Sequence, residues 1–267
     1  MKLTLLIISI FYVNLCFAQP EYPYSHYVDL VMLAEDAYVL KDFCKANEIY
    51  KKILTEVETP FHEEMIKGIE SASKCNDEDQ LLSISIKLAK GGIPVSFFKQ
   101  FDNTYWYHWF LDDFAEYEKH YRENYNPLLK ERIISLIKED SAYNAEYHKF
   151  REGAKYVSLE YQITGAESIS SQFADLNNEY GFPSEKRMGY NLSDGQLKDY
   201  DLWTLILHIY QRGEILYENA NYTRLIGVGD MHFLDEIFLD NNIGCSGIPD
   251  YGIVNEIQYR YIKYLRT

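Results

Sequence analysis

The sequence is short of basic residues and of cysteine. Its 267 residues include 26 lysines and arginines against 41 aspartates and glutamates, for a formal net charge of −15 at pH 7. Contact with a nucleic-acid backbone requires clustered lysine and arginine, so this composition argues against DNA or RNA as a partner. Only four cysteines occur and none form a Cys-x-x-Cys pair, which argues against a thioredoxin-like site or a zinc ribbon.

Several common signatures are also missing. The chain has no His-Glu-x-x-His, Gly-x-Ser-x-Gly, phosphate-binding loop or calcium-binding loop, so the usual hydrolase motifs are absent. After the first residues, no stretch approaches the about 20 apolar residues of a membrane helix. Apolar residues nevertheless make up 47% of the chain, which excludes disorder as the main state.

The first residues predict export. Lys2 supplies a positive start, residues 3–15 are mostly apolar, and residues 16–18 place small residues at positions −3 and −1 of a signal-peptidase site. A membrane anchor is disfavoured because the run is short and Pro20 follows, and lipid attachment at Cys16 lacks the small residue that should precede it. We expect residues 1–18 to be a signal peptide and the mature chain to be periplasmic or secreted, with no membrane span.

Residues 27–92 predict two helical hairpins. Apolar positions follow helical spacing over 27–54 with a joint at 41–43, and a second hairpin is expected from His62 to a stop at Gly91. The first hairpin resembles a tetratricopeptide repeat, because small, aromatic and apolar residues stand at that family's spacing: Ala34, Ala37, Ala46, Tyr50 and Ile53. The resemblance implies a concave face that holds a peptide or a helix.

Residues 94–125 contain twelve aromatic side chains. Phe110, Phe114, Tyr117 and Tyr121 recur at helical spacing, which favours a buried helix face, whereas residues 103–109 fit that stripe less well and are expected at the surface. A binding surface is therefore expected to use four aromatic residues, which are Tyr38, Tyr105, Trp106 and Tyr107.

Two cysteines are candidates for a disulfide. Cys44 and Cys75 are each expected at the end of the first helix of their hairpin, and equivalent helices of neighbouring repeats pack side by side. Two buried thiols are the alternative.

The second half predicts further helices. We expect them at 128–156, 167–180 and 199–210, with a polar loop at 184–198, two short segments at 219–229 and 230–240, and a tail at 253–265 that is either helix or strand. Residues 126–243 resemble an uncharacterised bacterial domain family that ends exported proteins, on the motif around Gly181-Phe182-Pro183 and on His208.

Two groups of polar residues are candidates for chemistry. His208 is either a core histidine or a general base, and the resemblance offers Asp140, Asp175 and Asp240 as the carboxylates that would orient it. The second group, around residues 227–236, predicts one of two structures. It is either a divalent-metal site, or a place where glycines end one helix and an aspartate caps the next. Its candidate ligands are Asp230, His232 and Asp235.

The sequence thus predicts an all-α protein with tetratricopeptide-like hairpins stacked on an irregular helical C-terminal domain. The expected parts are a signal peptide at 1–18, a repeat region at 19–125 and a helical domain at 126–267. The favoured function is a non-enzymatic interaction module of the envelope or cell surface that binds a protein or peptide and needs no cofactor. The alternative is a hydrolase of envelope or extracellular substrates that uses His208.

Overall fold

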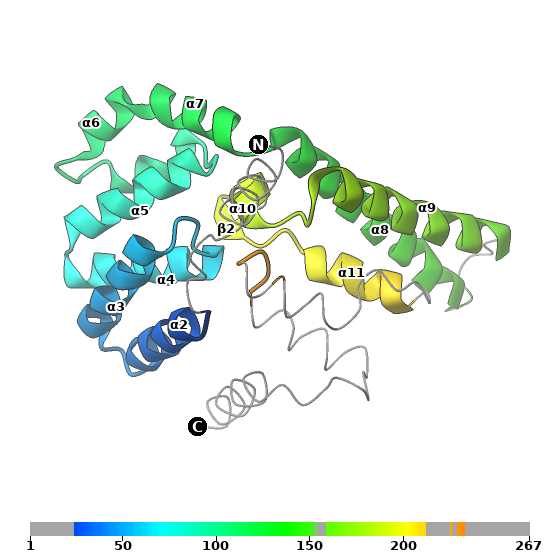
Figure 1. Cartoon of the computed structure of the whole chain (residues 1–267), viewed down its shortest axis with the longest axis horizontal. Helices are drawn as coiled ribbons and strands as arrows, with labels where there is room; N and C mark the ends of the chain where they lie inside the picture. The colour runs from blue at the N-terminus through cyan, green and yellow to red at the C-terminus, as the bar shows by residue number, and fades with distance from the viewer. Residues whose placement is uncertain (1–23, 152, 154–158, 212–224, 226–228, 233–267) are drawn as a thin grey trace, which may run out of the picture.

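The computed structural model describes residues 24–151, 153, 159–211, 225 and 229–232 (Figure 1). This part of the chain is mostly helical, which confirms the prediction of an all-α fold with stacked hairpins. None of its helices is long and apolar enough to cross a membrane. The predicted signal peptide, Asp235, Asp240, Cys245 and the tail at 253–265 lie outside the described residues.

Four helices stack in sequence order at the N-terminal side (Figure 1). Their bounds are α2 (Tyr24–Val39), α3 (Phe43–Glu56), α4 (His62–Cys75) and α5 (Glu78–Lys90). Helices α2 and α3 cross where Ala34 and Ala46 are both fully buried, because two helices approach closely only where side chains are small. Tyr50 and Ile53 fill the space beside them and are also fully buried.

The turn between α4 and α5 is set by two residues. Asn76 has a φ of 56° and ends α4 in the left-handed conformation that asparagine tolerates better than most residues. Asp77 then caps α5, because its side chain accepts a hydrogen bond from the backbone N–H of Gln80 at 3.0 Å.

Cys44 and Cys75 form a disulfide, with their Cα atoms 5.2 Å apart. The expected placement of Cys44 was wrong, because it lies in the first turn of α3, the second helix of its hairpin. Cys75 is the last residue of α4. The bond therefore joins antiparallel neighbours rather than equivalent helices of two repeats.

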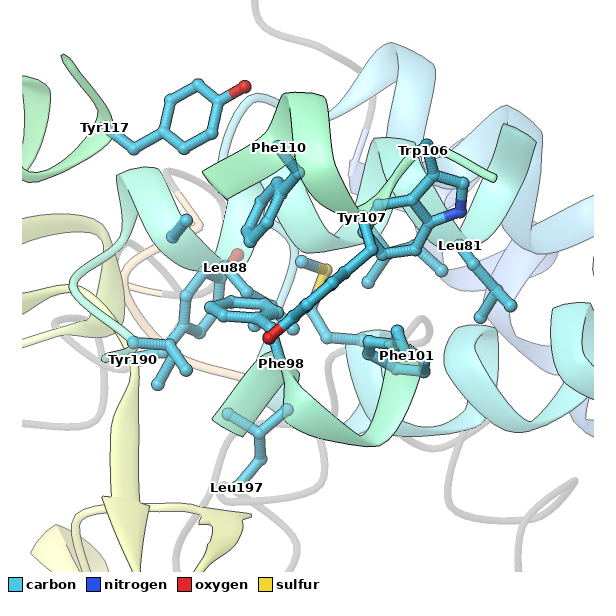
Figure 2. Close-up of a cluster of buried hydrophobic side chains, with 14 of the residues drawn as sticks. Leu81, Leu88, Phe98, Phe101, Trp106, Tyr107, Phe110, Tyr117, Tyr190 and Leu197 are labelled. Carbon is cyan, nitrogen blue, oxygen red and sulfur yellow. The ribbon is translucent and has the colours of Figure 1, made fainter. Parts of the chain in front are cut away.

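The aromatic block forms η1 (Val95–Phe101), α6 (Tyr107–Asp112) and α7 (Phe114–Asn124). Figure 2 shows its rings packed with leucines of α5 into one cluster, joined by Tyr190 and Leu197 from the second half. Trp106 is fully buried and Tyr107 is 9% exposed, which corrects the expectation of a surface position for these two residues, whereas Tyr105 and Trp109 are exposed as expected. A helix as short as α6 carries too few turns for periodicity to separate its inner face from its outer one.

The second half contains α8 (Pro127–Arg151), α9 (Leu159–Tyr180), α10 (Glu185–Met188), β1 (Asn191–Ser193), β2 (Gln196–Lys198) and α11 (Leu202–Gln211). The side chains of α8, α9 and α11 bury a second core that includes Ile133, Phe173 and Ile206. Helix α9 begins at Leu159 rather than at residue 167 as expected.

The prediction of a loop at 184–198 was wrong, because this segment contains α10 and the antiparallel hairpin of β1 and β2. In the hairpin, Leu192 pairs with Leu197. Asp194 and Gly195 have φ values of 54° and 76° and form the two-residue turn between the strands. An Asp-Gly pair is a strong hairpin signal in a sequence, since both turn positions need a positive φ.

Helix α10 and the hairpin lie between the two halves of the molecule (Figure 1). The backbone N–H of Tyr190 donates to the Gly91 carbonyl at 2.8 Å, and the Tyr190 hydroxyl donates to the Pro60 carbonyl at 2.8 Å. The backbone N–H of Asn126 donates to the Arg187 carbonyl at 2.7 Å. A segment late in the sequence therefore completes the packing of the first half.

Candidate functional site

An open hollow lies where α3 begins, α4 ends and α5 begins, and we call it the acidic groove. Its volume is about 850 Å³ when the open solvent within it is included. Its lining consists of Cys44, Asn47, Glu48, Cys75, Asn76, Asp77, Glu78, Asp79 and Tyr105. Four carboxylates line this groove and neither lysine nor arginine does. Lys51, outside the lining, pairs with Asp77 at 3.7 Å, so an excess of negative charge remains.

The fold concentrates these carboxylates through a helix start. The cap of α5 places Asp77, Glu78 and Asp79 together, because acidic residues in the first turn interact favourably with the helix dipole. Burial works to raise the pKa of Asp77, but hydrogen bonds from the Gln80 N–H and the Asn47 amide, together with the charge of Lys51, leave that pKa below its ordinary value. Asp77 is therefore ionised at neutral pH.

Asn47 forms the inner wall of the acidic groove. Its side-chain amide donates to Asp77 Oδ2 at 2.8 Å, and the residue is 5% exposed. Its Oδ1 atom is buried and accepts no hydrogen bond from the residues that the structure describes. An unsatisfied buried acceptor is costly, so this atom lowers the stability of the groove wall.

Two exposed aromatic rings stand at the edge of the acidic groove. Tyr105 is 52% exposed and Trp109 is 61% exposed, and their ring centroids lie 5.6 Å apart. The Tyr105 hydroxyl donates to Asp79, and its backbone N–H donates to Glu78 Oε2 at 3.2 Å. These bonds fix the ring beside the carboxylates, and the one to Asp79 is the main cause that raises the pKa of Tyr105.

The other predicted binding residues lie elsewhere. Tyr38 on α2 is half-buried, and its hydroxyl donates to Glu70. Trp106 and Tyr107 belong to the aromatic core. Of the four residues predicted for binding, only Tyr105 lines the acidic groove. The groove carboxylates were missed, because the run at 77–79 carries the same signal as an ordinary helix cap.

Asp140 and His208, two of the residues predicted for catalysis, meet in the second half. Their Oδ2 and Nδ1 atoms are 2.6 Å apart, between α8 and α11, and the Asn144 amide nitrogen also lies 2.6 Å from His208 Nδ1. The Asp140 side chain is 3% exposed and that of His208 is 25% exposed. Asp175 lies on the exposed face of α9, and Asp240 is outside the described residues.

The predicted metal ligands are held by different partners. Asp230 Oδ1 accepts a hydrogen bond from the Ser184 hydroxyl at 2.8 Å. His232 is buried, with Nε2 3.2 Å from Glu64 Oε1. Asp235 is not described, and within the described part of the chain no three histidine, cysteine or acidic side chains are grouped to hold a metal ion.

No family model matches this chain, and searches of curated proteins and of solved structures find no match to it. Both family resemblances therefore stay predictions, and the function has to be inferred from the geometry of the sites.

Proposed function

We propose that this protein is an exported, non-enzymatic interaction module whose acidic groove binds a basic segment of a protein or peptide. The observation that carries the proposal is the groove itself, with four carboxylates beside the exposed Tyr105 and Trp109 rings. Export rests on the signal peptide expected at residues 1–18.

The chemistry of the groove selects for arginine or lysine. Each carboxylate attracts a cation in water by about 1 kcal/mol at 4 Å, and four of them raise the local concentration of a basic partner. An exposed aromatic face adds about 0.5–1 kcal/mol for each cation that stacks on it.

A charge-removal experiment tests this proposal. The double variant Glu48→Gln and Asp79→Asn removes two groove charges while keeping the shape of both side chains. The control is Asp112→Asn with Glu116→Gln, two exposed carboxylates on α6 and α7. The binding of a labelled peptide of alternating arginine and alanine is measured by fluorescence anisotropy.

We expect the groove variant to bind this peptide about tenfold more weakly than the wild type, and the control variant to bind it normally. Binding should also weaken as salt is added, because exposed charges are screened beyond about 10 Å at 0.1 M. Equal loss in both variants would show a non-specific effect of net charge and would contradict the proposal.

The contact between Asp140 and His208 supports a second candidate function, hydrolysis of an envelope or extracellular substrate. A carboxylate at Nδ1 orients an imidazole and leaves Nε2 to act as a general base. The test is a panel of ester, peptide and glycoside substrates with wild type and His208→Ala. Any activity that survives in a folded His208→Ala protein does not use this residue and would remove the hydrolase proposal.

A further inference from the structure

A second pocket lies at the opposite end of α4 from the acidic groove. It is a small, half-open hollow between the start of α4, the residues around α10, and the start of α11. We call it the junction pocket, because both halves of the chain contribute to it. Its position was not predicted, since residues near 62, 185 and 203 become neighbours only through the tertiary fold.

One wall of the junction pocket is aromatic. Phe182 and Trp203 stack with their ring centroids 5.6 Å apart and their planes 23° from parallel. Phe61 lies in the same lining and meets the His232 ring edge to face, at 4.9 Å between centroids. Such faces attract cations through the negative charge of their π-systems.

The polar side of the junction pocket centres on His62. Its Nδ1 atom lies 2.8 Å from Glu185 Oε1 and 3.1 Å from Glu63 Oε2. The Glu185 Oε2 atom accepts the backbone N–H of His62 at 2.9 Å. One N–H at Nδ1 cannot satisfy two carboxylates, and neither Glu63 Oε2 nor Glu185 Oε1 accepts a hydrogen bond from the described residues, although each lies at ion-pair distance from Nδ1.

The charges in this lining do not cancel. His62 and Glu185 form a pair that is neutral overall, whichever residue holds the proton. The Asp230 carboxylate accepts the Ser184 hydroxyl and lies 4.0 Å from the Arg187 guanidinium, and His232 is paired with Glu64. Glu63 and the exposed Asp199 remain, so the pocket carries an excess of about two negative charges.

From the aromatic wall, the unsatisfied carboxylate oxygen and the negative excess, we propose that the junction pocket binds a small organic cation, an ammonium or guanidinium group on a short apolar stem. The cation would donate to Glu63 and approach Asp199, while its stem packs against Trp203. Pockets that combine apolar walls with a few convergent polar groups are the usual sites for such ligands. This proposal does not depend on the acidic groove.

Matched ligands test the charge requirement directly. We would titrate the full mature chain by isothermal calorimetry with N-acetyl-arginine methylamide and with its citrulline analogue, which has nearly the same shape but no charge. Agmatine serves as a free small cation, and a blocked Ala-Arg-Ala peptide presents the same group on a chain. Binding of agmatine alone would identify the natural ligand as a free metabolite. Binding of all three arginine-type probes would identify it as a side chain of a protein. Both results support the proposal.

Three variants locate the binding. Asp199→Asn removes one exposed carboxylate of the pocket mouth, and Asp112→Asn is the matched control on α6. The groove variant Glu48→Gln with Asp79→Asn shows whether the probe binds at the acidic groove instead. Because Asp199 is exposed, its substitution leaves the buried pair of His62 and Glu185 in place.

We expect Asp199→Asn to weaken binding of the arginine probe at the junction pocket by about tenfold and Asp112→Asn to leave it unchanged, while the groove variant loses only the binding that belongs to the acidic groove. The citrulline analogue should not bind measurably. Three outcomes would overturn the proposal: equal binding of the citrulline analogue, loss of binding only in the groove variant, or no saturable binding of any cationic probe by the wild type.

Discussion

At the scale of single residues, the surroundings of His62 change the pKa of its imidazole. Burial works to lower its pKa, but Glu185, Glu63 and Asp199 together raise that pKa to about 9. Burial raises the pKa of Glu185, and His62 opposes that shift. The pair links the start of α4 to α10, so its protonation affects how the two halves hold together.

The sign of this effect predicts a loss of stability in alkali. The ordinary pKa of histidine is about 6.5, so the folded protein holds the His62 proton more tightly than the unfolded chain does. The resulting stability is fully present below pH 6.5 and is lost as the pH rises to about 9. We expect the free energy of unfolding to fall by about 1–3 kcal/mol across this window, measured by urea titration.

A His62→Gln variant isolates this contribution. Burial lowers the pKa of Lys130 to about 8, so Lys130 adds stability as the pH rises above that value and opposes the His62 effect. The difference between wild type and His62→Gln cancels the Lys130 contribution. If this difference does not change between pH 6.5 and 9, the pKa of His62 is not raised in the folded protein.

At the scale of elements, the disulfide ties α3 to α4 at the acidic groove. It closes a loop with a sequence separation of 31 residues, which corresponds to about 3–4 kcal/mol of reduced entropy in the unfolded chain. We expect Cys44→Ser with Cys75→Ser to lower the free energy of unfolding by about that amount. A reducing agent should have the same effect on the wild type.

The control for the disulfide is Cys245→Ser, which should leave the unfolding midpoint unchanged. Denaturant titrations with and without a reducing agent provide the measurement. A double serine variant as stable as the oxidised wild type would show that the cysteines are not joined in solution.

Helix α10 ends at a glycine that has no room for a side chain. Gly189 has a φ of 76°, and a Cβ atom there would lie 2.2 Å from the Gly91 carbonyl oxygen. Gly195 in the hairpin turn has the same φ of 76° but has no atom within 4 Å of a Cβ position. A comparison of alanine substitutions at the two positions therefore separates the energetic cost of backbone strain from the cost of a steric collision.

We expect Gly195→Ala to cost about 1 kcal/mol, from the left-handed conformation alone. Gly189→Ala should cost at least about 2 kcal/mol more, because relief of the collision requires the Gly91 backbone to move and breaks its bond with Tyr190. Thermal unfolding of both variants gives the comparison. Equal costs would show that α10 does not pack closely against Gly91.

These elements also show which parts of the fold can be predicted from local sequence patterns. Helical spacing and caps predicted α2 to α5 nearly residue by residue, because those signals lie within the helices themselves. The hairpin at Asp194-Gly195 was predictable from its turn but was missed within a polar segment. Trp106 was wrongly expected at the surface, because its burial depends on η1 and α5 packing over it.

At the scale of the whole molecule, the two halves share a core. Tyr190 and Leu197 lie in the aromatic cluster of the first half. Both come from the second half of the chain, because Tyr190 follows α10 and Leu197 lies in β2. Figure 2 shows Leu197 below the rings of the aromatic block and Tyr190 to the left of Phe98. The predicted division at residue 125 follows the end of α7, but the packing does not follow that division.

A fragment of residues 24–125 should therefore be less stable than the same residues in the full chain. Loss of two buried large side chains leaves a cavity and exposes Phe98 and Gly91, which costs several kcal/mol by comparison with large-to-small core substitutions of about 2–5 kcal/mol each. Hydrogen exchange of α5 amides provides the measurement. Equal protection in the fragment and the full chain would mean that the first half folds without this contribution.

The sequence by itself determined helices α2 to α5 and their pairing into hairpins, because these depend on residues that are close together in the chain. Only the tertiary structure decided which aromatic rings are buried, that Asp140 meets His208, and that His62 faces Glu185. The physical reason is that these contacts join residues 68 and 123 positions apart, and no local spacing encodes such distances. The acidic groove lies between the two cases, since three of its four carboxylates are adjacent in the sequence but its walls come from three helices.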